Sequence, residues 1–167
     1  MRHIIAILLQ NEAGALTRVA GLFSTRGYNI ESLSVAATED PTVSRITLVT
    51  QGSEAVIHQI ASQLLKLVDV VSVEDMTSGE HLERELLLVK LEVPAGKRSS
   101  IDPILARNGA RVISDKAAGL IVELTSSEGA VTRLIEELAT VARVCEVVRS
   151  GALGISQAVA QGGAGRT

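Results

Sequence analysis

The sequence of 167 residues has almost no aromatic side chains: one phenylalanine, one tyrosine and no tryptophan. The core must therefore be aliphatic, since 46% of the residues are still hydrophobic, which is enough to bury a core and to argue against disorder. The same absence removes the aromatic platforms on which proteins stack single-stranded nucleic acid.

Basic runs and long apolar runs are also missing. The net charge is -3 at pH 7, and the lysines and arginines are scattered, whereas a nucleic-acid-binding domain concentrates them in a patch. The apolar run from Ile4 to Leu9 ends at Gln-Asn-Glu with no cleavage signature, far short of the roughly 20 residues that span a membrane. We expect no nucleic-acid partner and no membrane partner.

Cys145 is the only cysteine, so no internal disulfide can form, and a cytoplasmic setting is expected. Its place in the apolar pattern VCEVV favours a small core residue over a nucleophile. The three histidines are too far apart in sequence for a metal-binding spacing, and no G-x-S-x-G motif occurs. The glycines are spaced too widely for a phosphate-binding loop. We expect no catalytic residue, no metal site and no cofactor in this chain.

Hydrophobic periodicity predicts an element order of β-α-β-β-α-β in the first half. A helix begins near Leu16, whose spacing with Val19, Ala20 and Phe23 gives one apolar face, and Gly27 is expected to end it. The other predicted elements are strands at 4–9, 28–36, 44–51 and 69–76, a turn at 39–42 and a helix at 56–67.

The second half repeats this order after a polar segment. Strands are predicted at 85–93, 110–117, 119–126 and 143–151, and a helix over 131–138. A further helix is expected around Ile101, Ile104 and Leu105, with Pro103 in its first turn, where proline is tolerated.

The pattern predicts an α+β protein made of two ferredoxin-like domains in tandem, each a four-stranded antiparallel sheet with two helices on one face. The expected boundaries are 1–77 for the first domain, 78–84 for a linker, 85–152 for the second domain and 153–167 for a flexible tail. The first strand should be central. The second sheet face stays bare, which favours pairing with another copy.

A candidate ligand site lies where the first strand meets the first helix. Asn11 offers amide donors and an acceptor, Gly14 lets the chain approach a ligand closely, and the first helical amides carry the positive end of the helix dipole. Asn29 can bond an ammonium or a carboxylate, and Leu16 and Ile30 can supply an apolar wall. This set suits an amino acid that is sensed and not transformed. The alternative is that Asn11 is only a helix cap and Asn29 only a turn residue.

The same residues carry a family resemblance. The run NEAGALTRVAGLFSTRGYNIESLSVAATEDPTVSRITLV closely resembles the small regulatory subunit of acetolactate synthase (acetohydroxyacid synthase). Its N-x-x-G-x-L turn, here Asn11, Gly14 and Leu16, is that of an ACT domain. The stretches LVDVVSV, ERELLLVKL and EVVRSG extend the resemblance to about Ser156.

The resemblance implies a regulator and not an enzyme. It would bind the catalytic (large) subunit, raise its activity and confer feedback inhibition by valine in branched-chain amino acid biosynthesis. Thiamine diphosphate, FAD and magnesium would belong to the catalytic partner. The effector site would form between two ACT domains of a homodimer. Its residues here would be Asn11, Ala13, Gly14, Ala15, Leu16, Asn29 and Ile30.

Two other classes remain open from sequence. A stand-alone ACT-type amino-acid sensor would regulate another partner, although no helix-turn-helix or basic segment accompanies it. A small ferredoxin-like phosphatase would need an anion loop with a positioned arginine and asparagine. Arg18 and Asn11 are present, but Arg18 is set well into the predicted helix and is expected to face solvent.

Overall fold

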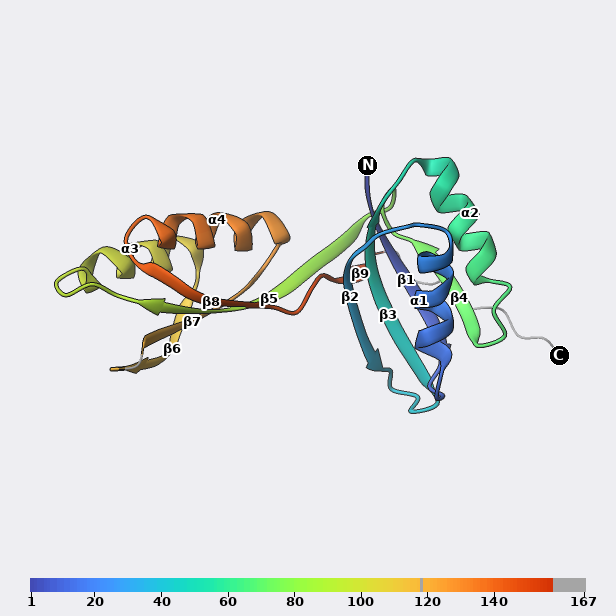
Figure 1. Cartoon of the computed structure of the whole chain (residues 1–167), viewed down its shortest axis with the longest axis horizontal. Helices are drawn as coiled ribbons and strands as arrows, with labels where there is room; N and C mark the ends of the chain where they lie inside the picture. The colour runs from blue at the N-terminus through green and yellow to red at the C-terminus, as the bar shows by residue number, and fades with distance from the viewer. Residues whose placement is uncertain (118, 158–167) are drawn as a thin grey trace. The chain divides into compact units, whose positions relative to one another are not determined.

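The computed structural model describes residues 1–117 and 119–157. The chain divides into two compact units, each built on its own sheet (Figure 1). The first unit comprises Met1–Leu82 together with residues 154–157, and the second comprises Glu83–Leu153.

The first unit has the predicted β-α-β-β-α-β order. Its elements are β1 (Arg2–Gln10), α1 (Ala15–Thr25), β2 (Ile30–Ala37), β3 (Val43–Gln51), α2 (Glu54–Leu64) and β4 (Val70–Asp75). The antiparallel sheet has the order β2-β3-β1-β4, and both helices cover one face of it (Figure 1). The ferredoxin-like prediction and the central position of β1 are confirmed.

Alternation along β1 divides its side chains between the two sheet faces. Ile5 and Ile7 point to the helices and join a core that includes Val19 and Phe23 from α1. Ile4 points the other way and is also buried. The strand is therefore apolar at consecutive positions because both of its faces are covered.

The second unit repeats the order. Its elements are β5 (His81–Glu92), α3 (Arg98–Asn108), β6 (Arg111–Lys116), β7 (Gly119–Ser126), α4 (Glu128–Ala139) and β8 (Arg143–Arg149). The sheet order is β6-β7-β5-β8, with a further strand β9 (Leu153–Ser156) pairing with β5. An aliphatic core of β5, β7 and both helices lies under it.

The two units divide between Leu82 and Glu83, inside the expected linker 78–84, but two details of the expected organisation differ from the structure. Strand β5 begins at His81, inside the expected linker 78–84. Residues 153–156, expected in a flexible tail, form β9, and residues 158–167 lie outside the described chain. Gly154 lies against the outer sheet face of the first unit, because a Cβ there would come within 2.6 Å of Met76 Cε and 2.8 Å of Ile4 Cδ1. The carbonyl of Gly154 accepts a hydrogen bond from Arg45 at 3.1 Å. This face of the first sheet is thus partly covered, contrary to the expectation that it is bare.

Helix α3 begins earlier than expected. It starts at Arg98, so Pro103 is its sixth residue and not part of its first turn. Pro103 has no backbone N–H, so one i→i−4 hydrogen bond is missing near the start of the helix. The first turn, Arg98-Ser99-Ser100, is polar, so apolar periodicity gave no signal for it.

Candidate functional site

The turn between β1 and α1 centres on Gly14. Its φ of 87° is the left-handed conformation that glycine adopts without steric cost, and it serves as the N-cap of α1 with no side-chain cap. Asn11 does not cap the helix: its Nδ2 donates to the carbonyl of Pro41 at 2.8 Å, and its N–H donates to Thr42 O at 2.7 Å. Asn11 instead ties the turn to the loop between β2 and β3.

The positive end of the α1 helix dipole is not compensated by a side chain of the first turn. Ala15 N donates to Glu12 O at 3.2 Å and Arg18 N donates to Gly14 O at 3.0 Å, while the amides of Leu16 and Thr17 between them have no backbone acceptor among the described residues. The first turn contains no acidic residue to offset the dipole. Ala13 is exposed, Ala15 is buried, and Leu16 is 40% exposed, which leaves an apolar side chain open beside these amides. The turn can therefore accept an anion such as a carboxylate.

An ion pair that sequence analysis missed lies against Gly14. Arg18, expected to face solvent, donates from Nε to Asp69 Oδ2, and the Asp69 side chain is only 8% exposed. Arg18 NH1 would be 3.1 Å from a Cβ placed at Gly14, so the guanidinium lies over the turn. No sequence pattern could pair two residues that are 51 positions apart.

The pair changes the acid–base chemistry of the turn. The hydrogen bond from Arg18 holds the pKa of Asp69 below its ordinary value, although partial burial opposes this. The same bond raises the pKa of the Arg18 guanidinium. The Arg18 guanidinium therefore stays charged beside the turn, where the carboxylate of Asp69 balances it and Glu12 also acts on it, so the helix dipole is the unbalanced positive feature.

Asn29 and Ile30 lie at the other end of α1. Gln10 pairs with Val43 at one end of β3, whereas Ile30 pairs with Thr50 at the opposite end. Helix α1, whose 11 residues are about 16 Å long at 1.5 Å per residue, runs between the two places. The Asn29 side chain is exposed, and its carbonyl accepts from Thr50 Oγ1 at 2.6 Å.

The residues expected to hold an effector therefore fall into two separate groups within one chain. We call Asn11, Ala13, Gly14, Ala15 and Leu16 the turn half-site, and Asn29 with Ile30 the strand half-site. The structure brings the members of each together but does not bring the two half-sites to one place within a chain. A small ligand that touches both must lie between two chains.

Other expected features can be placed directly. Cys145, expected in the core, is exposed on β8. Over residues 1–117 and 119–157, no three His, Cys, Asp or Glu side chains gather in a way that could hold a metal ion. None of the helices in this part of the chain is long and apolar enough to cross a membrane.

Comparisons with known families cover both units. A family described as an AHAS small subunit-like ACT domain matches residues 5–72. A second family, described as the small subunit of acetolactate synthase, matches residues 84–158. The match thus includes both half-sites.

Individual proteins agree with these families. The acetolactate synthase isozyme 3 small subunit of Escherichia coli (strain K12) is 44% identical over 157 residues, covering 94% of this chain and 96% of that protein. The probable acetolactate synthase small subunit of Archaeoglobus fulgidus is 40% identical over 136 residues, covering 81% and 85% of the two chains. The crystal structure of the acetolactate synthase small subunit from Thermotoga maritima superposes with a TM-score of 0.85 at 30% identity, covering 95% of this chain and 99% of that one. The chain belongs to the family of acetolactate synthase small subunits, and its first unit is an ACT domain.

Proposed function

We propose that this chain is the regulatory subunit of an acetolactate synthase. It binds the catalytic large subunit, raises its activity and makes it sensitive to feedback inhibition by valine. The observation that carries the proposal is similarity to named small subunits over 94% of the chain. Thiamine diphosphate, FAD and magnesium are assigned to the large subunit, and the reaction takes place there.

Valine is proposed to bind between the ACT domains of two chains. Its carboxylate meets the turn half-site of one chain, where the first amides of α1 and the Arg18 guanidinium supply positive charge. Its ammonium meets Asn29 of the other chain. Leu16 and Ile30 pack against its side chain from the two halves.

Two features of the turn half-site support this placement. Helix α1 lacks a side-chain cap and an acidic first turn, so its positive end is open to a ligand. Asn11 is held by Pro41 O through Nδ2, which leaves its side-chain oxygen as an acceptor for the ligand's ammonium. The half-sites lie at opposite ends of α1, which is why a homodimer is required.

Regulation is then a shift between two forms of the dimer. Valine must bind the form that does not activate the large subunit more tightly than the form that does. The coupling required is typically about 1–3 kcal/mol, or a change of roughly 5- to 150-fold in affinity. A ligand shared by two chains can supply such a difference, because a small change in their relative position opens or closes its site.

The test is reconstitution with a purified large subunit. The chain alone should synthesise no acetolactate, should raise the rate of the large subunit, and should bring inhibition by valine with it. Titration of the isolated chain with valine, leucine and isoleucine ranks the effectors. If the isolated chain binds valine in calorimetry but does not change the activity of the synthase, a stand-alone amino-acid sensor would be favoured instead. Turnover by the chain alone would contradict a regulatory role.

A further inference from the structure

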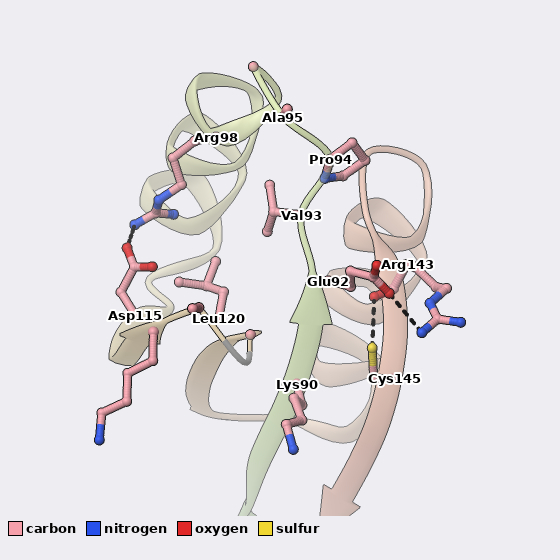
Figure 2. Close-up of a pocket in the computed structure, with 14 residues that line it drawn as sticks. Lys90, Glu92, Val93, Pro94, Ala95, Arg98, Asp115, Leu120, Arg143 and Cys145 are labelled. Carbon is pink, nitrogen blue, oxygen red and sulfur yellow. Dashed lines mark hydrogen bonds and ion pairs between the residues drawn. The ribbon is translucent and has the colours of Figure 1, made fainter.

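The second unit contains a cavity of about 750 Å³ at one end of its sheet. Its walls come from the end of β5, the turn at 94–96, the start of α3, residues 115–117 at the end of β6, residues 119–120 at the start of β7, and the start of β8. Figure 2 shows Arg98 and Arg143 on opposite sides of it, with Val93 between them and Lys90 below. A hollow of this size matches the pockets that hold small molecules.

The cavity lies at the position in the second unit that corresponds to the β1–α1 turn of the first unit. The turn from β5 to α3 is the counterpart, in the second β-α-β-β-α-β unit, of the turn from β1 to α1 in the first. Gly96, with φ of 77°, stands near the helix start as Gly14 does with φ of 87°. Helix α3 also begins with no side-chain cap and no acidic residue in its first turn. The positive end of a second helix thus opens at the cavity.

The charges around the cavity favour an anion. Four cationic side chains line it, Lys90, Arg98, Lys116 and Arg143, against two carboxylates, Glu92 and Asp115. Carboxylates position the arginines: Arg143 lies 2.7 Å from Glu92, and Arg98 lies 3.3 Å from Asp115 and 3.1 Å from Asp102 of its own helix.

The two lysines have no such partners. Among the described residues, neither the Lys90 nor the Lys116 ammonium forms an ion pair or hydrogen bond. The stem of Lys90 crosses Gly119, with Cγ 3.5 Å and Cε 3.8 Å from where a Cβ would stand. A Cβ at position 119 would be in ordinary van der Waals contact with this stem and 3.1 Å from the carbonyl oxygen of Leu91, so the Lys90 side chain lies along the backbone of the neighbouring strand. The Lys90 stem thus packs beside Gly119, and its ammonium has no carboxylate partner among the described residues.

We propose that this cavity binds a small molecule with two or more negative charges, through Lys90 and Lys116 together with the start of α3. The two positioned arginines add to the positive potential and fix the orientation of the ligand. Phosphate groups and clustered carboxylates share the required chemistry. A small ligand is favoured over an acidic protein surface because the charges surround a hollow and do not lie on a flat face. The site is distinct from both half-sites and does not depend on valine.

The test uses the full chain and two probes, pyrophosphate and citrate, titrated by calorimetry at low and physiological salt. The double variant Lys90→Gln/Lys116→Gln should bind about tenfold more weakly or worse, which corresponds to about 1.4 kcal/mol. The control Lys66→Gln removes an exposed lysine of the first unit and should bind as the wild type does. Urea unfolding of each variant checks that the fold is intact.

Each outcome decides the matter. Binding of both probes supports a general multivalent anion site, and binding of one alone identifies phosphate or carboxylate as the ligand chemistry. If neither probe binds at millimolar concentration, or if the double variant binds as well as the wild type, the proposal is overturned. Valine binding is measured in the same proteins and should be unchanged, so the result stands apart from the proposed regulatory function.

Discussion

Asn11 and Asn29 lie at opposite ends of strand β3, Asn11 bonded to Thr42 and Asn29 to Thr50. At about 3.3 Å per residue, roughly 25 Å of strand separates the two positions. A free amino acid spans only a fraction of that distance. If both residues contact the same effector, the effector bridges two chains, and the site exists only in a dimer.

Gly14→Asp should abolish inhibition by valine. The new carboxylate would repel that of valine and would compete with Asp69 for Arg18, whose NH1 lies 3.1 Å from the added Cβ. Aspartate tolerates the left-handed backbone better than most residues, so the fold should survive. We expect valine affinity to fall at least about tenfold, measured by calorimetry and by inhibition of the reconstituted synthase.

Gly21→Ala is the matched control. Gly21 lies within the same helix, and a Cβ there meets nothing within 4 Å. Alanine is the better helix former, by about 1 kcal/mol, so the variant should be slightly more stable. Its valine response should equal that of the wild type. Persistent inhibition in Gly14→Asp, or its loss in Gly21→Ala, would contradict the turn half-site.

Asn29→His should make the synthase insensitive to valine while activation of the large subunit persists. The contact that anchors this position uses the backbone carbonyl, which accepts from Thr50 Oγ1 at 2.6 Å and does not depend on the side chain. The strand should therefore form normally. Pull-down of the large subunit and the activation ratio measure partner binding. A variant that loses activation as well would show that Asn29 serves the partner interface.

Asp69 should make the first unit sensitive to acid. Its pKa is depressed in the folded state by Arg18, so its ionised form stabilises the fold above its ordinary value of 3.8. That contribution is lost as pH falls below about 4 and through the lower folded value. In Asp69→Asn this pH-dependent stabilisation should be absent. The free energy of unfolding of the variant should therefore fall less steeply than that of the wild type between about pH 5 and pH 2.

Urea unfolding across this pH range compares the two proteins. Two other carboxyls also have lowered pKa values: Asp40, through its hydrogen bond with Thr42, and Glu137, through its hydrogen bond with Arg107. Both are present in the wild type and in the variant, so the difference between the two stability curves reports on Asp69. Parallel curves would mean that the pair with Arg18 does not form in solution.

Gly154→Val should destabilise the first unit, even though residue 154 lies beyond the second. The added side chain would overlap Met76 and Ile4, since even a Cβ comes within 2.6 Å of the former. Overpacking of this kind costs about 1–3 kcal/mol. Gly79→Ala, whose Cβ meets only Met76 O at 3.9 Å, should change little. Urea midpoints for the first unit give the measurement, and equal midpoints for wild type and Gly154→Val would show that residues 154–157 do not pack there.

Much of the fold followed from local patterns. Apolar residues at helical spacing predicted α1, and the apolar run from Ile4 predicted that β1 would be central, because both signals lie within one element. The start of α3 was missed because its first turn is polar. Strand β9 was missed because it has only four residues, one of them Gly154, and because its partner strand β5 and its contacts Met76 and Arg45 come from distant parts of the chain.

Only the part of the candidate site that depends on local sequence was predicted. Gly14 and Asn11 were identified from the turn itself, and the structure shows the left-handed glycine there. The pairing of Arg18 with Asp69 is a tertiary contact that no spacing encodes. The separation of Asn11 from Asn29 depends on strand register, which becomes visible only once the sheet is assembled.

The central claim, that one effector is held by the turn half-site of one chain and the strand half-site of another, is tested most directly with mixed dimers. Gly14→Asp and Asn29→His chains, each silent toward valine alone, are co-expressed with different tags and purified through both. A shared site predicts that each mixed dimer regains one intact site, built from the unaltered turn of the Asn29→His chain and the unaltered Asn29 of the Gly14→Asp chain. Calorimetry should then find about half the wild-type number of valine sites at wild-type affinity. Mixed dimers that bind no valine would contradict the shared site, because damage to sites lying within single chains cannot be rescued by mixing.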